Sequence, residues 1–122
     1  TDANPEALVS AYFETFNKHD ASALGLFYAD SCDMKDPSLG TAKRRMSATD
    51  ISKKYADMFA YFKTLKDSVI ATYPSGNCIT VEFISIGTLP DSSKLYLPIC
   101  TVFEFKDRKI IKDITYYNNA NE

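Results

Sequence analysis

The sequence lacks tryptophan and has little histidine, cysteine, glycine or proline. Its 122 residues include one histidine, three cysteines, four glycines and five prolines. With His19 as the only histidine, a metal site built from histidines is excluded, and no cysteine spacing suggests a thiolate site. His19 also lies in an expected turn, remote from the other candidate residues, which disfavours Ser-His-Asp or Cys-His catalysis. We therefore expect neither a metal nor a cofactor.

An excess of one charge sign and long hydrophobic runs are also absent. The 14 basic and 16 acidic residues give a net charge of −2, so we expect no nucleic-acid or membrane partner. No apolar run is long enough to cross a bilayer, and no secretion or lipidation signal is found. Cys32, Cys78 and Cys100 lie in apolar, strand-like runs. We interpret them as reduced, buried side chains of a cytoplasmic protein.

The first half of the chain has helical periodicity. Asn4, Asp20 and Ser47 are suitable N-caps for three helices, the second of which should run to about Tyr28. Apolar residues recur at helical spacing after the first and third caps, which predicts two stripes facing a core. The stripes consist of Leu8, Tyr12, Phe13 and Phe16, and of Ile51, Tyr55, Met58, Phe59 and Phe62.

The second half has the period of two that is typical of strands. A short strand over 32–36 and a loop over 37–45 precede the third helix. Four strands are then expected at about 66–73, 77–87, 95–106 and 109–117, joined by turns that contain Pro, Gly, Asn or Asp. Helices followed by antiparallel strands indicate a single α+β domain over residues 1–122. We expect a cone-shaped barrel, with three N-terminal helices packed on a strongly curved antiparallel sheet around an apolar pocket.

The expected strands carry apolar residues on both faces. One face should be concave and line the pocket; it carries Val81, Phe83, Ser85, Leu97, Ile99, Thr101, Phe103, Phe105, Ile111, Asp113, Thr115 and Tyr117. The opposite face is less polar than a solvated sheet should be; it carries Ile84, Ile86, Tyr96, Val102, Ile110, Ile114 and Tyr116. A second copy of the chain would cover that outer face, so we expect a homodimer.

Asp36 and Tyr12 are the strongest candidates for chemistry. Alternation along the short strand places Asp36 on the same face as Cys32 and Met34, so its carboxylate would be a buried general base. The alternative is an Asp that caps a turn before Pro37. Tyr12, on the stripe of the first helix, would direct its hydroxyl into the same interior. Its alternative role is that of an ordinary core aromatic.

Asp113 is the third candidate. It lies between Ile111 and Thr115 on an apolar face of the last strand, so it should either be buried with a partner or line a polar cavity. A one-residue bulge would instead turn it outward and put Lys112 in its place. Two acids and a phenol from distant parts of the chain would then meet in one hollow.

The order of these elements resembles the nuclear transport factor 2-like superfamily, and within it the SnoaL-like and ketosteroid-isomerase-like members. The residues that carry the resemblance are 12–40, YFETFNKHDASALGLFYADSCDMKDPSLG, and 103–118, FEFKDRKIIKDITYYN. The resemblance covers the whole chain in order and spacing and implies one SnoaL-like domain. Because this superfamily contains isomerases, cyclases, dehydratases, epoxide hydrolases and non-catalytic binders, it implies a fold more strongly than an activity.

The resemblance also implies roles for individual residues. Tyr12 corresponds to the oxyanion donor of ketosteroid isomerases and Asp36 to their general base, whereas Thr101 stands where those enzymes have a protonated Asp. Asp113 falls where cyclases and epoxide hydrolases have a cavity carboxylate. Substrate contacts are expected from Phe16, Met58, Phe83, Thr101, Phe103 and Tyr117. The expected function is acid–base chemistry, without a cofactor, on a small apolar carbonyl or hydroxyl compound; the alternative is a non-catalytic binding or dimerisation module.

Overall fold

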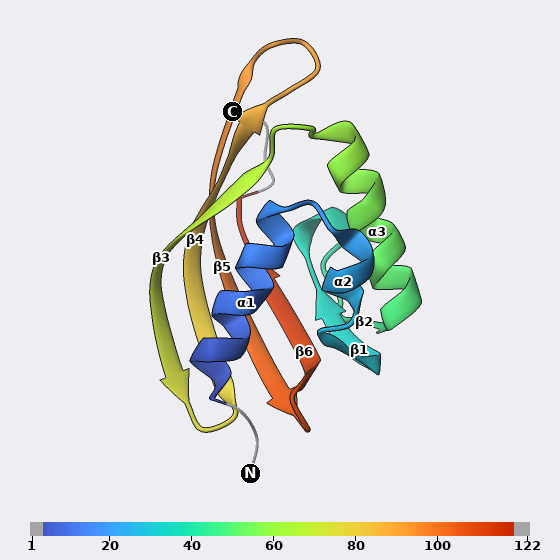
Figure 1. Cartoon of the computed structure of the whole chain (residues 1–122), viewed down its shortest axis with the longest axis vertical. Helices are drawn as coiled ribbons and strands as arrows, with labels where there is room; N and C mark the ends of the chain where they lie inside the picture. Colours follow the sequence, from blue (N-terminus) through green and yellow to red (C-terminus); the bar gives the residue numbers. More distant parts are fainter. Residues whose placement is uncertain (1–3, 119–122) are drawn as a thin grey trace.

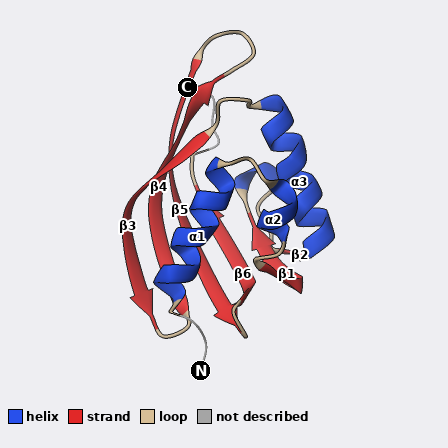
Figure 2. Cartoon of the chain, in the orientation of Figure 1, coloured by secondary structure: helices blue, strands red, loops and turns tan. Residues whose placement is uncertain are grey.

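The computed structural model describes residues 4–118, which form three α-helices, one short 3-10 helix and six strands. The helices lie on one face of a single curved sheet (Figures 1 and 2). In chain order the elements are α1 (Pro5–Asn17), α2 (Ala21–Gly25), β1 (Tyr28–Lys35), η1 (Pro37–Leu39), β2 (Arg44–Ser47), α3 (Ala48–Tyr61), β3 (Lys66–Ser75), β4 (Cys78–Thr88), β5 (Lys94–Lys106) and β6 (Lys109–Tyr116).

The three expected helix starts are confirmed by their caps. The side chains of Asn4, Asp20 and Ser47 each accept a hydrogen bond from a backbone N–H in the first turn of α1, α2 and α3. Both apolar stripes face the sheet. Their buried members are Tyr12, Phe13 and Phe16 of α1 and Ile51, Tyr55 and Phe59 of α3, whereas Leu8, Met58 and Phe62 are partly buried. Val9, which the expected stripe did not include, is also buried. No helix among residues 4–118 is both long enough and apolar enough to span a bilayer.

The sheet has the strand order β2-β1-β6-β5-β4-β3, with antiparallel pairs except between β1 and β6, which run parallel. The prediction of an α+β fold with helices on a curved, mostly antiparallel sheet is confirmed. The expected cone is open and not a closed barrel, because β2 and β3 form two separate edges and do not pair with each other within residues 4–118. The four long strands begin and end within two residues of the expected positions.

Two local predictions in the first half are wrong. The second helix ends at Gly25, and Tyr28 begins a strand that is longer than the expected 32–36. The segment expected to be a loop, 37–45, contains η1 and the first residues of β2, which pairs with β1 through Met46 opposite Cys32. A four-residue edge strand with two adjacent arginines has no alternation of apolar residues, so its strand character comes from its neighbour and not from its own sequence.

A β-bulge changes the expected facing of β6. Phe105 pairs with Ile110 and Glu104 pairs with Lys112, which leaves Ile111 as an extra residue. Ile110 is therefore fully buried, although the alternation predicted that it would face outward, and the expected concave position of Ile111 is wrong. Because the bulge precedes Asp113, that residue keeps its inward direction.

Candidate active site

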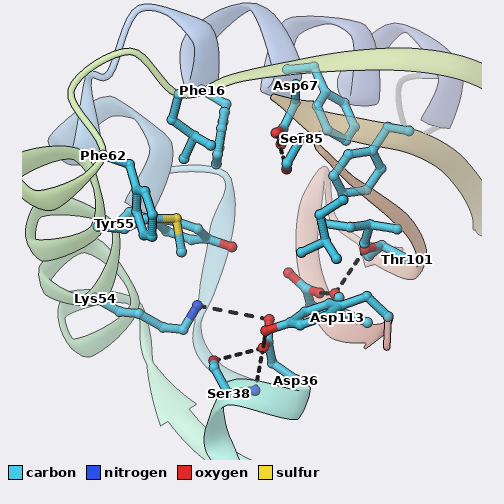
Figure 3. A pocket seen from close by; sticks show the side chains of 18 of the residues that line it. Phe16, Asp36, Ser38, Lys54, Tyr55, Phe62, Asp67, Ser85, Thr101 and Asp113 are labelled. Carbon is cyan, nitrogen blue, oxygen red and sulfur yellow. Dashed lines mark hydrogen bonds and ion pairs between the residues drawn. The ribbon is translucent and has the colours of Figure 1, made fainter. Parts of the chain in front are cut away.

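A cavity of about 310 Å³ lies between α1, α3 and the concave face of the sheet (Figure 3). This volume lies at the lower end of the range that small-molecule sites occupy. All nine side chains that the sequence nominated as catalytic or substrate-binding line it, and their roles stay predictions. They are Tyr12, Phe16, Asp36, Met58, Phe83, Thr101, Phe103, Asp113 and Tyr117.

Asp36 lies at the end of β1, where the chain turns into η1. Its Oδ1 accepts hydrogen bonds from the Ser38 backbone N–H at 2.9 Å, the Ser38 hydroxyl at 2.7 Å and the Tyr117 hydroxyl at 3.0 Å. The residue caps η1 and also lines the cavity, so the two alternatives for Asp36 coexist. Three donors hold Oδ1, which leaves Oδ2 to face the cavity and Lys54.

Lys54 is a cavity residue that the sequence did not reveal. Its Nζ lies 4.0 Å from Asp36 Oδ2 and 4.7 Å from the centroid of the Tyr55 ring. The side chain is only 15% exposed, and its Nζ is buried without a hydrogen-bond partner among residues 4–118. A buried ammonium without an acceptor costs free energy unless a ligand supplies one. Lys54 is therefore positioned to receive a negatively charged or developing anionic oxygen (Figure 3).

Asp113 lies on β6 and is 3% exposed. Its Oδ2 accepts a hydrogen bond from the Tyr28 hydroxyl at 2.7 Å, and its Oδ1 accepts one from the Thr115 hydroxyl at 3.1 Å. Burial is the main effect on the Asp113 carboxyl group and raises its pKa to about 6. The two hydrogen bonds and the Lys54 charge act in the opposite direction, but they do not cancel the effect of burial. A carboxyl group with this pKa can exchange a proton near neutral pH.

Three phenol groups meet beside Asp113. The hydroxyls of Tyr12 and Tyr28 are 2.8 Å apart, and that of Tyr55 lies 3.2 Å from Tyr12. Tyr12 and Tyr55 line the cavity, and Figure 3 shows the Tyr55 hydroxyl directed into it. Burial raises the pKa of all three phenols well above the ordinary value of 10.0, so they remain protonated at neutral pH. The group forms a preorganised set of hydroxyls that ends on Asp113.

Thr101 and Tyr117 complete this end of the cavity. The Thr101 and Thr115 hydroxyls are 2.8 Å apart, which links Thr101 to Asp113 through Thr115. Burial, with the nearby Asp36 carboxylate as the second cause, raises the pKa of Tyr117 to about 12. Tyr117 therefore acts as a donor to Asp36, and its expected role as part of the cavity wall is compatible with this position.

The rest of the cavity is mainly apolar, with one exception at its opposite end. Apolar walls come from α1, α3 and the sheet strands, through Phe13, Phe16, Met58, Phe62, Leu65, Phe83, Leu95, Leu97, Ile99 and Phe103. Asp67 on β3 and Ser85 on β4 lie at the end away from Asp36 (Figure 3). Neither was nominated from the sequence as a functional residue. Ser85 was expected on the concave face. For Asp67, the sequence predicted only that it lies near the start of a strand.

The arrangement supplies the components of acid–base chemistry. Asp36 is a carboxylate held by three donors, Lys54 is a buried cation whose Nζ has no hydrogen-bond partner among residues 4–118, and the phenols are donors at one end of a mainly apolar cavity. Such groups remove a proton and stabilise the negative charge that develops on an oxygen. Among residues 4–118 no group of three or more His, Cys, Asp or Glu side chains is arranged to hold a metal ion.

Solved structures with the same fold are numerous. A protein of ketosteroid isomerase-like fold from Catenulispora acidiphila DSM 44928, crystallised with trimethylamine, has a TM-score of 0.81 at 20% identity and covers 92% of this chain and 85% of its own. The epoxide hydrolase/cyclase-like enzyme SalBIII of salinomycin pyran ring formation has a TM-score of 0.82 at 15% identity, with 94% and 91% covered. IdmH, a proposed polyketide cyclase from Streptomyces antibioticus, has a TM-score of 0.83 at 15% identity, with 96% and 94% covered.

These similarities at low identity establish the fold and leave the activity open. A search of curated protein sequences finds no match. The model of the SnoaL-like domain matches residues 9–112, which run from within α1 to the middle of β6 and contain most of the cavity residues; Asp113, Thr115 and Tyr117 follow directly after the matched range. The chain therefore belongs to the SnoaL-like domain family.

Proposed function

We propose that this protein is an enzyme that carries out acid–base chemistry, without a cofactor, on a small, largely apolar carbonyl or hydroxyl compound. One observation carries the proposal. The Asp36 carboxylate and the buried Lys54 ammonium, which has no hydrogen-bond partner among residues 4–118, lie 4.0 Å apart at the polar end of an apolar cavity. A base beside a cation that lacks an acceptor is suited to a reaction in which charge develops on an oxygen.

Each group has a role in this reaction. Asp36 takes a proton from the carbon next to a carbonyl group, and the electron pair moves onto the carbonyl oxygen. Tyr12, whose hydroxyl donates to Tyr55 in the free protein, turns this donation to that oxygen, with the adjacent Tyr55 hydroxyl and the Lys54 charge assisting. In a β,γ-unsaturated compound the returning electron pair shifts the double bond into conjugation, and Asp36 gives the proton to the γ-carbon, which completes an isomerisation. Asp113 positions the phenols and supplies a second acid, base or water-holding group.

The same groups suit cyclisation and hydration, which also need an acid and a base on opposite sides of a bond. SalBIII, an epoxide hydrolase/cyclase-like enzyme, and IdmH, a proposed polyketide cyclase, have the same fold, which supports this range of reactions. A non-catalytic binding module is the second candidate. It is favoured by the structural use of Asp36, which caps η1 and accepts a bond from Tyr117.

Hydrogen exchange on an apolar ketone separates the two candidates. We expect the wild-type protein to accelerate exchange of the acidic protons of 2-tetralone in D₂O by about a hundredfold or more over buffer, measured by proton NMR. The Asp36 carboxylate would supply the base and the cavity would hold the ring. Binding of 2-tetralone and a panel of related ketones without any acceleration would favour the non-catalytic module.

We also propose a homodimer through the outer face of the sheet. Ile86, Tyr96 and Tyr116 are 41%, 67% and 49% exposed on strands β4, β5 and β6. Light scattering should give about twice the chain mass of 13.7 kDa, and Tyr96→Glu should halve it, because a charge in an apolar interface is costly. The mass of a single chain for the wild type at micromolar concentration would contradict this proposal. Tyr61→Glu makes the same substitution at a 59% exposed position at the end of α3, away from the outer face of the sheet, and should leave the mass unchanged.

A cytoplasmic location is part of the same proposal. Cys32, Cys78 and Cys100 are all free thiols, and Cys32 is fully buried. Burial raises the pKa of Cys32 to about 12, so it remains a protonated, unreactive thiol. Free thiols are usual in a reducing compartment, which supports this location.

A further inference from the structure

The far end of the cavity holds an acid and a hydroxyl that the proposed reaction does not use. Asp67 at the start of β3 lies directly opposite Ser85 on β4 in the strand register. The Ser85 hydroxyl donates a hydrogen bond to Asp67 Oδ1. Both residues are 7% exposed and both line the cavity, on the side away from Asp36 and Asp113 (Figure 3).

The Asp67 carboxyl group has one polar partner where it could have several. Among residues 4–118 its Oδ2 accepts no hydrogen bond, and no basic side chain forms an ion pair with it. The basic side chains of the adjoining segments are engaged elsewhere: Lys66 Nζ donates to the Asn17 carbonyl at 2.6 Å, and His19 Nε2 lies 2.6 Å from the Leu65 carbonyl. The Oδ2 atom of this buried carboxyl group can therefore accept a hydrogen bond from a ligand in the cavity.

The backbone of Asp67 is fixed by α1. The Asn17 side-chain amide donates to the Asp67 carbonyl at 3.0 Å, and its oxygen accepts from the Asp67 N–H at 2.8 Å. This pair of bonds at the entry to β3 holds the carboxyl group in one place. A group that is fixed before a ligand arrives loses little entropy on binding, which is typical of binding sites.

A purely structural role explains these features poorly. The cavity that Asp67 lines is mainly apolar, and its walls include Phe62, Leu65, Phe83 and Leu95. Burial raises the pKa of Asp67 to about 7, so its ionised form opposes folding at neutral pH. An apolar residue at this position would pack without that cost, whereas a ligand donor would satisfy the open oxygen.

We propose that Asp67 and Ser85 form a second polar subsite, which accepts a hydrogen bond from a hydroxyl or protonated amine at the far end of the cavity ligand. The ligand would then be an elongated, apolar carbonyl compound with a hydrogen-bond donor at the end opposite the carbonyl. The inference rests on the proposed function only for the placement of the carbonyl near Asp36 and Lys54.

Four ketones on one ring system test the subsite by isothermal titration calorimetry. The parent is 2-tetralone; the others carry a hydroxyl, a methoxy or a dimethylaminomethyl group at position 6. In the wild type we expect the hydroxyl compound to bind about five- to tenfold more tightly than the parent, and the methoxy compound, which cannot donate, to gain nothing. The protonated amine should gain more than tenfold, and its gain should grow as Asp67 ionises with rising pH.

The decisive comparison is the ratio of affinities within each variant. Asp67→Leu should bring the hydroxyl and amine ratios to about one, and Ser85→Ala should reduce them. If Asp67→Leu fails to fold, Asp67→Asn should remove the gain from the amine, because an amide carries no charge. Asp57→Leu, on the exposed side of α3, should leave both ratios at their wild-type values.

The outcomes for the subsite and for the proposed reaction are separable. Equal ratios in the wild type and Asp67→Leu, or no gain from either donor in the wild type, would overturn the subsite while 2-tetralone exchange stands. Loss of exchange in Asp36→Asn with intact affinity ratios would support both. Failure of all four ketones to bind the wild type would overturn both.

Discussion

Replacing Asp36 by Asn should lower the rate of ketone hydrogen exchange by a factor of about 10² to 10⁴, equivalent to about 3–5 kcal/mol of transition-state stabilisation. Asn keeps the size of the side chain and an oxygen that can accept from Ser38 and Tyr117, so η1 should remain capped. It removes the basic carboxylate that faces Lys54. The measurement is kcat/KM for 2-tetralone exchange, with the affinity of the same ketone measured separately by calorimetry.

The matched control is Asp33→Asn on the same strand. Asp33 points outward, where its Oδ1 accepts from Arg45 at 2.8 Å, and its side chain is 36% exposed. We expect this variant to exchange 2-tetralone at the wild-type rate, because it touches no cavity residue. An Asp36→Asn protein that binds the ketone and exchanges it at the wild-type rate would remove Asp36 from the mechanism.

Replacing Asp67 by Asn should stabilise the protein at about pH 8 by about 2–4 kcal/mol and change little at about pH 4. Burial raises the pKa of Asp67 from 3.8 to about 7. Below the lower value both the native and the unfolded chain carry the proton, so ionisation has no effect on stability. Between the two values only the unfolded chain releases it, and the stability falls as pH rises until the native carboxyl ionises near pH 7. An amide cannot ionise, so the variant escapes this loss.

The measurement is urea unfolding of wild type and Asp67→Asn across this pH range. The difference between the two proteins is the informative quantity, because burial also raises the pKa of Asp113, to about 6, and Asp113 contributes a similar slope to both. Asp57→Asn on the exposed side of α3 should leave the wild-type pH dependence unchanged. Equal stability of wild type and Asp67→Asn at every pH would mean that the Asp67 carboxyl is not desolvated in the native state.

A stability gain in Asp67→Asn also bears on function. A residue that opposes folding at neutral pH persists where it contributes to binding or catalysis, and active sites commonly show this conflict. The calorimetric series and the unfolding experiment therefore measure two consequences of one buried carboxyl group. For Asp67→Asn, the expected combination is loss of the affinity gain from the protonated amine together with higher stability at neutral pH.

Local periodicity predicted most of the fold. The helical spacing of apolar residues predicted α1 and α3, and the alternation of residues with a period of two predicted β3 to β6. The same reasoning missed β2 because Arg44 and Arg45 are strand residues only by pairing with β1. It also misplaced Tyr28, since a two-residue connection between α2 and β1 leaves no Gly or Pro to mark the change.

The polar end of the cavity was partly predictable. Alternation along the strands predicted that the side chains of Asp36 and Asp113 point inward, and the helical stripe predicted the same for Tyr12. Lys54 escaped detection because one charged residue on an amphipathic helix is normally solvated. Asp67 escaped because a carboxylate at the start of an edge strand is ordinarily exposed, and only pairing with Ser85 and the bonds to Asn17 reveal its burial.

The spacing of apolar residues along the chain specifies most of the helices and strands and the direction of most side chains, because it orients each side chain relative to its local backbone. The open sheet, the parallel pairing of β1 with β6 and the meeting of Tyr12, Tyr28, Tyr55 and Asp113 appear only once the elements are packed together. These features depend on strand order, register and one bulge. They are set by contacts between segments far apart in the chain, which local periodicity does not encode.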